Sequence, residues 1–157
     1  MPMTLYYRRA EGSDLETLVA MLADDELGAK REQAALPLAD GYRRAFAAIE
    51  ADPNNDVIVA VEGEAVVGML QLTFLPGLTY VGSWRAQIEG VRVAGDRRGL
   101  GIGRGLCEWA IAHARERGCR LVQLTTDKTR PEALRFYESL GFIASHEGLK
   151  QRLDPLN

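Results

Sequence analysis

The sequence predicts a single α/β domain, and three features of the chain indicate it. Its 157 residues are enough for one domain with a hydrophobic core and too few for two ordinary domains. Hydrophobic residues make up 46% and charged residues 26%, which is the balance of a globular chain. Runs with strand character and segments with helical periodicity follow one another along the chain. We therefore expect one domain over residues 1–157.

The first half of the chain is predicted to hold a strand, two helices and a hairpin. Residues 4–9 form the opening strand, and Ser13 and Glu16 have the spacing of a capping box at the start of a helix. After an irregular charged stretch, a second helix is expected over about 38–50. Two β-rich runs, 57–61 and 65–74, then flank a Glu62-Gly63-Glu64 turn.

The second half is predicted to continue with strands and helices in alternation. A strand near 85–93 leads through a glycine-rich loop into a helix over about 103–117. A strand over 121–126 follows, and Pro131 begins another helix that ends at Gly141. A last strand is expected from Phe142 toward Leu153.

Composition and charge exclude several classes of function. The net charge of −3 argues against a nucleic-acid-binding protein, which would carry a basic excess to neutralise phosphates. No apolar run has the length of a signal peptide core or a membrane span, so we expect a cytoplasmic protein with no membrane partner. Two cysteines, Cys107 and Cys119, are expected to be free thiols, and His113 and His146 are too few for a zinc site.

The informative segment is 87–106, where a strand feeds glycines that open a helix. Such a junction binds anions, because glycine lets the backbone approach closely and the helix dipole adds partial positive charge. The dinucleotide-binding fingerprint fails, since Arg104 stands five residues after Gly99 and Leu106 five after Gly101. No Gly-Lys-Ser/Thr follows for a nucleotide P-loop. The segment therefore indicates a site for the pyrophosphate of a ligand that is bound by neither of these two motifs.

Arg98, Gly101 and Gly103 fit the pattern Arg/Gln-x-x-Gly-x-Gly/Ala, with Val93 five positions before the arginine. This segment resembles the signature of the GNAT superfamily of N-acetyltransferases. The second half of the family pattern also stands downstream, in residues 133–142. The resemblance covers residue 56 to the C-terminus, and residues 130–142 are similar to aminoalkylphosphonate acetyltransferases. One departure is Arg130, where many relatives have an asparagine that contacts the pantetheine arm.

The resemblance implies a fold, a donor and a class of acceptor. The fold would be one GNAT-like α/β domain, with a mixed central sheet of about six to seven strands flanked by about four helices. Acetyl-CoA would be the co-substrate, and no metal would be needed. The acceptor would be a primary amine on an unidentified small molecule, and the superfamily's habit suggests a homodimer.

Seven residues are expected to bind the donor. The backbone amides of Gly99, Gly101 and Gly103 would hold the CoA pyrophosphate. Arg98 and Arg104, together with Arg97, could screen the phosphates, although each arginine could equally belong to an ordinary solvated face. Family resemblance places the backbone of Val91 and Val93 against the pantetheine and the acetyl carbonyl.

Two residues are candidates for proton transfer. Strict alternation puts Glu89 on one face of its strand, together with Arg85, Gln87, Val91 and Val93. Partial burial there would suit a base that accepts the proton of the amine. The alternative is that Glu89 forms a structural ion pair. Tyr137 stands at the tyrosine position of the family's second motif and resembles the general acid that protonates the CoA thiolate. The alternative is a tyrosine packed for its ring alone.

Two further interpretations remain open. The chain could be a catalytically weak module of the same fold that binds acyl-CoA as a sensor, although a degenerate domain need not retain both Glu89 and Tyr137. The acidic run Asp24-Asp25-Glu26 could attract a cationic amine, but charge runs are usually solvated faces, and we expect that here.

Overall fold

The computed structural model describes residues 3–154, which fall into two compact units. The first unit reaches Leu124 and the second begins at Thr125. In the described residues there are five strands and six α-helices in an α/β arrangement with a mixed sheet.

The first unit holds the whole sheet. In chain order its elements are β1 (Tyr6–Arg9), α1 (Leu15–Ala23), α2 (Glu26–Arg31), α3 (Asp40–Ala51), β2 (Asn55–Glu62), β3 (Ala65–Pro76), α4 (Thr79–Gly82), β4 (Trp84–Val93), α5 (Ile102–Glu116) and β5 (Cys119–Gln123). Short 3₁₀ turns precede α1 (Gly12–Asp14) and follow β4 (Gly95–Arg97). The second unit contains α6 (Pro131–Ser139), whose proline stands in the first turn as expected.

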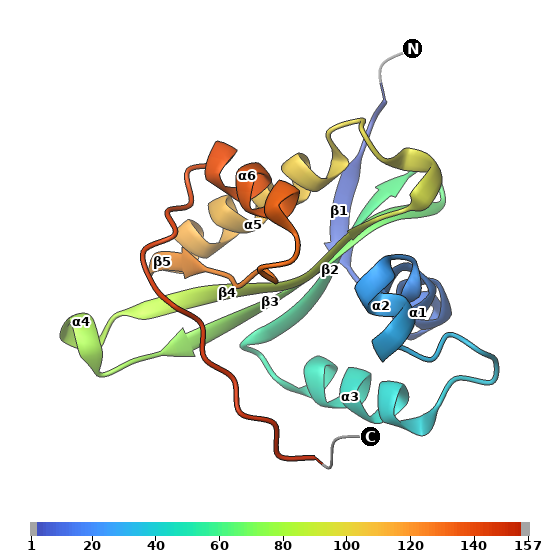
Figure 1. Ribbon diagram of the computed structural model, residues 1–157, viewed down its shortest axis with the longest axis horizontal. Coiled ribbons are helices and arrows are strands. Elements are labelled where there is room, and N and C mark those ends of the chain that lie inside the picture. Colours follow the sequence, from blue (N-terminus) through green and yellow to red (C-terminus); the bar gives the residue numbers. More distant parts are fainter. Residues whose placement is uncertain (1–2, 155–157) are drawn as a thin grey trace. The chain divides into compact units, whose positions relative to one another are not determined.

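The five strands pair in the order β1-β2-β3-β4-β5. The first three pairings are antiparallel, and β4 pairs with β5 in parallel, which makes the sheet mixed. The β3–β4 hairpin carries α4 at its far end (Figure 1). The predicted hairpin β2–β3 is confirmed, with Gly63 in the turn at φ 62°.

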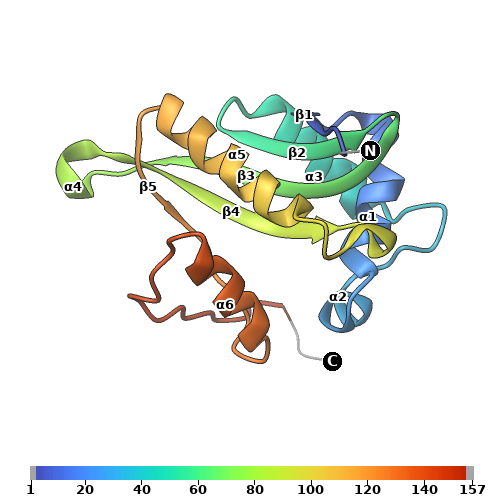
Figure 2. The ribbon, with the colours of Figure 1, turned by 90° about the horizontal axis from the view of Figure 1, so that it is seen from above.

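Helices cover both faces of this sheet. On one face, Leu18 and Met21 of α1 pack against Val57, Val59 and Met69. The residues that alternate with these point to the other face, where α5 packs along β3 and β4 (Figure 2). Gly68 lies directly under Ile102 and Leu106 of α5, and a Cβ added there would come within 2.8 Å of Leu106. The core is therefore split into two layers by the sheet.

The predicted last strand is wrong. Within the described part of the second unit no strand follows α6, so the sheet has five strands rather than six to seven. The apolar residues Ile143, Leu149 and Leu153 of this segment are almost fully exposed and belong to no strand. Polar residues also interrupt the segment, so it lacks a continuous apolar face to bury.

The helices also differ from expectation in number and in one cap. The structure has six rather than about four in residues 3–154, because α2 occupies the stretch expected to be irregular and α4 is a single turn. Asp25 caps α2 by accepting a hydrogen bond from the backbone N–H of Gly28. The capping box lies earlier than predicted: Asp14, and not the Ser13–Glu16 pair, accepts the backbone N–H of Glu11 at 2.7 Å.

Candidate active site

The glycine cradle, residues 99–103, joins β4 to α5. Gly99 and Gly101 both have left-handed backbone conformations, with φ of 79° and 82°. Gly101 is the N-cap of α5, and Gly103 lies in its first turn. Ile102 and Leu106 are fully buried and fix the start of this helix against the sheet. The helix N-terminus, with its unpaired backbone N–H groups, is therefore held in place by the core.

The cradle suits a phosphate group. A Cβ added to Gly99 or Gly101 would meet no atom within 4 Å, so the space beside both backbones is open. α5 is 15 residues long, and its dipole places partial positive charge at this end. An open backbone at the N-terminus of a long helix can accept an anion, and a side chain at either glycine would occupy that space.

The arginines around the cradle are each paired with a carboxylate. Arg97 contacts Glu62 at 2.6 Å, and Arg104 contacts Glu108 at 2.9 Å one turn along α5. The Arg98 guanidinium donates to the backbone carbonyl of Asp24 at 2.8 Å. About half of the Arg98 and Arg104 side chains stays exposed, so a bound phosphate could reach both groups.

The acidic run of residues 24–26 is only in part the solvated face that we expected: Asp24 and Glu26 are exposed, and Asp25 is partly buried. The Asp24 carboxylate lies 3.5 Å from the Arg98 guanidinium, and the Asp25 carboxylate lies 3.0 Å from the Arg92 side chain. Both members of the second pair are largely buried. These contacts tie the α1–α2 junction to the end of β4 and to the cradle.

A bulge in β4 changes the predicted alternation. Met69 pairs with Arg92 and Gln71 with Glu89, so one residue of β3 opposes Gly90 and Val91 together. Gly90 adopts φ 63°, which a residue with a side chain rarely takes. The bulge places Arg92 on the face of Glu89 and turns Val93, which pairs with Gly68, to the other face. The strict alternation is therefore wrong beyond Gly90.

Val91 and Val93 lie on a stretch of β4 that β5 does not reach. The parallel β4–β5 ladder ends at the pair Gln87–Gln123. Beyond this pair the edge of β4 is not bonded to β5, and both valines are half-buried. An acyl chain could reach backbone groups at such a strand edge.

Glu89 lies just before the bulge, and it is exposed rather than partly buried. Its neighbours on the same face of β2 to β5 form a polar row: Asn55, Gln71, Thr73, Gln87 and Gln123. Asn55 accepts hydrogen bonds from Gln71 at 3.0 Å and from Thr73 at 3.4 Å. Within residues 3–154, Glu89 does not form the structural ion pair considered for it, and its carboxylate instead accepts a hydrogen bond from Gln87.

Sequence reasoning missed this polar row. The signal was present in β3, where Gln71 and Thr73 alternate with Leu70, Leu72 and Phe74. Polar side chains at every second position of a strand indicate one polar face. On this face the sheet changes from apolar at Met69, beneath α1, to polar from Gln71 onward.

Tyr137 belongs to the second unit, where α6 positions it. Its ring packs edge-on against Phe136, with centroids 5.1 Å apart, and against Phe142 at 6.0 Å. The side chain is partly buried. This packing holds the ring of Tyr137 by contacts that do not use its hydroxyl.

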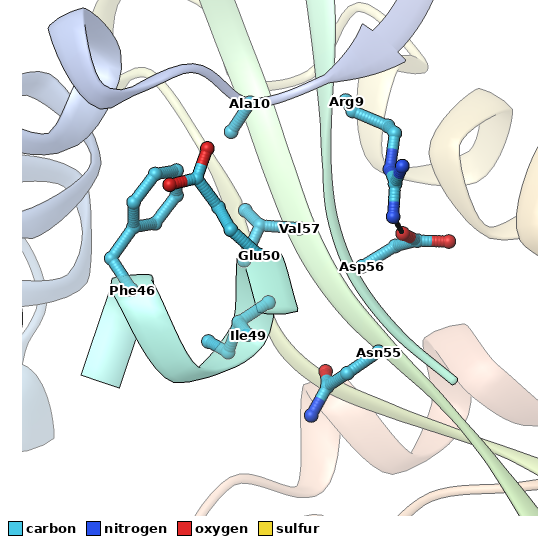
Figure 3. A pocket seen from close by; sticks show the side chains of 8 residues that line it. All are labelled: Arg9, Ala10, Phe46, Ile49, Glu50, Asn55, Asp56 and Val57. Atoms are coloured by element: carbon cyan, nitrogen blue, oxygen red, sulfur yellow. Dashed lines mark hydrogen bonds and ion pairs between the residues drawn. The ribbon is translucent and has the colours of Figure 1, made fainter. Parts of the chain in front are cut away.

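Two cavities in the first unit lie away from the predicted site residues. One, of about 120 Å³, is lined by α3 and β2 side chains, and Arg9 and Asp56, which form an ion pair, lie at its border (Figure 3). A second, of about 480 Å³, is bordered by Trp109 and His113 of α5 and by Ile58. Neither includes a residue of the glycine cradle, which is an open backbone surface.

The cysteines have no direct part in the site. Both are free, and burial raises the pKa of the Cys107 thiol to about 12, which keeps it protonated. Across residues 3–154 no three His, Cys, Asp or Glu side chains gather in a way that could hold a metal ion. None of the helices in that range is both long and apolar enough to cross a membrane.

The proteins to which this chain is similar in sequence or structure include the following three. A curated relative, the aminoalkylphosphonate N-acetyltransferase of Salmonella typhimurium, is 36% identical over 105 residues, which cover 67% of this chain and 68% of that protein. A crystal structure described as a transcriptional regulator from Bacillus halodurans is 61% identical with a TM-score of 0.93, covering 96% of this chain and 100% of the other. A putative acetyltransferase from Agrobacterium tumefaciens is 31% identical with a TM-score of 0.82, covering 94% and 99%.

The family assignment follows from the span of the sequence match. The acetyltransferase (GNAT) family matches residues 19–142, which include β4, the glycine cradle, α5 and α6. Both halves of the sequence pattern, around Gly101 and around Tyr137, lie inside this span. The chain belongs to the acetyltransferase (GNAT) family.

Proposed function

We propose that this chain transfers the acetyl group of acetyl-CoA to the primary amine of a small molecule. The observation that carries the proposal is the glycine cradle, where two left-handed glycines with open space beside them begin a long helix. That geometry suits the pyrophosphate of CoA. The family match and the named activity of the Salmonella relative support acetyl transfer.

The proposed reaction is a direct attack by the amine. The amine nitrogen bonds to the thioester carbonyl carbon, the carbon–sulfur bond breaks, and CoA leaves as its thiolate. Glu89 takes the proton that the amine loses, directly or through water, and Tyr137 supplies a proton to the thiolate. Val91 and Val93 lie on the stretch of β4 that β5 does not reach, where their backbone would hold the pantetheine arm and the acetyl carbonyl.

Donor binding would fall to the cradle and its arginines. Gly99, Gly101 and Gly103 would offer backbone N–H groups to the pyrophosphate. Arg98 and Arg104 are half-exposed and would contribute charge while keeping partners on this chain. Arg98 would exchange part of its contact with Asp24 for a phosphate oxygen.

Release of free thiol from acetyl-CoA tests this function. The acceptors to be tested are a panel of amines: aminoalkylphosphonates, amino acids, amino sugars and polyamines, each with a no-enzyme control. We expect thiol release that depends on one class of amine and is matched by acetylated product. Amine-independent release would indicate hydrolysis, and no release with any amine would contradict the proposed transfer.

A second candidate is a sensor that binds acyl-CoA with little turnover. The relative at 61% identity is described as a transcriptional regulator, which favours considering a regulatory role. Both candidates predict that CoA raises the melting temperature, since any ligand of the native state does so. They differ in thiol release: a sensor binds acetyl-CoA and releases no thiol with any amine of the panel.

A further inference from the structure

The first observation concerns the point at which β4 and β5 separate. Gln87 and Gln123 form the last pair of the parallel ladder, and their side chains are joined as well. The Nε2 of Gln123 donates to the Oε1 of Gln87 at 2.9 Å. This side-chain hydrogen bond therefore joins β4 to β5 at the point where their backbone pairing ends.

The second observation links this pair to Glu89. The Nε2 of Gln87 donates to the Oε1 of Glu89 at 3.0 Å, between two residues of one strand face. The three side chains form a chain of hydrogen bonds that runs from Gln123 through Gln87 to the carboxylate. Among the residues described, the second carboxylate oxygen of Glu89 accepts no hydrogen bond and so remains available.

The chemistry of the amide gives this chain a direction. An ionised carboxylate only accepts hydrogen bonds, so Gln87 must present its NH₂ group to Glu89 and its carbonyl oxygen to Gln123. With the Gln87 amide turned over, its oxygen would face an oxygen of Glu89 and that bond would be lost. Glu89 therefore selects the orientation of the Gln87 amide, and Gln123, which donates to the Gln87 oxygen, holds Gln87 from the other side.

We propose that Gln87 is a positioning residue that orients the carboxylate of Glu89 toward the reacting amine, and that Gln123 holds Gln87 in place. The proposal rests on the proposed function, because it gives Glu89 the role of base. One oxygen of Glu89 is fixed by Gln87, and the other faces the acceptor. A misplaced base transfers protons poorly, so the effect belongs to kcat rather than to donor binding.

The chain offers a matched control in Gln71. This glutamine pairs directly with Glu89 from β3 and lies on the same face. Its amide donates to Asn55 and not to Glu89. Gln71→Leu therefore removes the same chemical group, a side-chain amide, from the position directly opposite Glu89, and it leaves the hydrogen-bond chain intact.

Nuclear magnetic resonance tests the chain without any turnover. In ¹⁵N-labelled protein, we expect Glu89→Ala to shift the side-chain NH₂ resonances of Gln87 strongly and those of Gln71 weakly. Unchanged Gln87 resonances in a folded variant would overturn the inference and leave the proposed acetyl transfer standing.

Kinetics tests the consequence, with the amine that gives the fastest thiol release as the acceptor. Gln87→Leu should lower kcat between about tenfold and 100-fold with the KM for acetyl-CoA unchanged, whereas Gln71→Leu should change kcat less than about twofold. In a Glu89→Gln background, Gln87→Leu should have no further effect, because two residues that act as one unit are not additive. An equal loss in both backgrounds would mean a structural role and would overturn the positioning role. A wild-type protein that acetylates no amine would instead overturn the proposed function, and the role of Glu89 with it.

Discussion

Gly101 shows how one residue can set the binding of the donor. Its φ of 82° disfavours any residue with a Cβ, and the space beside its backbone is open. We expect Gly101→Val to raise the KM for acetyl-CoA at least about tenfold, because a β-branched side chain would fill the place of a phosphate. Initial rates at varied acetyl-CoA concentration measure this effect.

Gly63→Val serves as the control for Gly101→Val. It separates the effect of backbone strain on stability from the effect of a side chain on donor binding. Gly63 also has a positive φ, 62°, and open surroundings, but it lies in the β2–β3 turn. Both variants should lose about 1–2 kcal/mol of stability from the left-handed backbone. Only Gly101→Val should change the KM, and an equal change in both variants would remove the cradle from donor binding.

The residues of the site were predictable to different degrees. The glycine spacing sufficed for the cradle, because a short chain segment alone determines a strand-to-helix turn. Gln87 and Glu89 were expected on one face of a single strand, but the bond from Gln123 to Gln87 was not predictable, since Gln123 comes from another strand whose register depends on the whole sheet. The partners of Arg98 and Arg92 were missed for the same reason: they lie at the distant α1–α2 junction.

Asp14 connects two elements, β1 and the turn that begins α1. Two hydrogen bonds join its carboxylate to Arg8, at 2.7 and 3.1 Å. These bonds, together with the one from the Glu11 backbone, hold the pKa of Asp14 below its ordinary value in spite of burial. A carboxyl with a lowered folded-state pKa stabilises the protein above about pH 4 and loses this contribution as the pH falls further.

We therefore expect Asp14→Asn to cost about 1–3 kcal/mol of unfolding free energy at pH 7, and less below pH 4. Urea unfolding at about pH 7 and pH 3 measures the difference. Glu16→Gln, at an exposed position of α1, serves as the control and should change little at either pH. A loss that is the same at both pH values would show that the Asp14 charge does not contribute.

The tip of the β3–β4 hairpin is a strained element. Tyr80 and Val81 have left-handed conformations, with φ of 53° and 61°, and Val81 is 99% exposed. A β-branched residue pays a steric cost there that no burial offsets. We expect Val81→Gly to raise stability by about 1 kcal/mol, or the melting temperature by about 2–4 °C.

Leu78→Gly is the control for the tip. Leu78 is 98% exposed in the same turn but has an ordinary φ of −78°. Glycine at this position gains no relief from strain and increases the entropy of the unfolded chain, so stability should fall slightly. A gain of the same size in both variants would mean that Val81 is not strained.

At the scale of the elements, periodicity predicted long segments and failed on short ones. The ranges of α3, β2, β3 and β4 match within a few residues, because each carries an extended apolar pattern. The six-residue α2 and the four-residue α4 are too short for any period to be seen. The bulge at Gly90 was invisible for another reason: its position is set by the register with β3.

For the whole molecule, the mixed α/β fold was predictable and the number of strands was not. In the first unit the strands bury apolar residues against helices on both faces, and six consecutive residues of β2 are buried. The segment after α6 has apolar residues but no such pattern, so nothing in it specified a sheet edge. The family resemblance led us to expect further strands that the described residues do not form.

Tyr137→Phe tests whether the second unit contributes to the chemistry of the whole molecule. The substitution keeps the ring that packs against Phe136 and Phe142, so α6 should stay folded. It removes the hydroxyl proposed to protonate the thiolate. General acid catalysis contributes about 10²–10⁴-fold, so kcat should fall by up to that factor while the KM for acetyl-CoA stays near the wild-type value.

The size of the fall decides the role of the hydroxyl. CoA is a fairly good leaving group, so a fall of about tenfold should be followed with a thioester whose thiol is more acidic. Such a donor needs less help from an acid, and the variant should then recover part of its rate relative to wild type. A change in the KM alone would mean that the hydroxyl binds the donor. Full activity in a folded Tyr137→Phe protein would assign the proton to water and limit the chemistry to residues of the first unit.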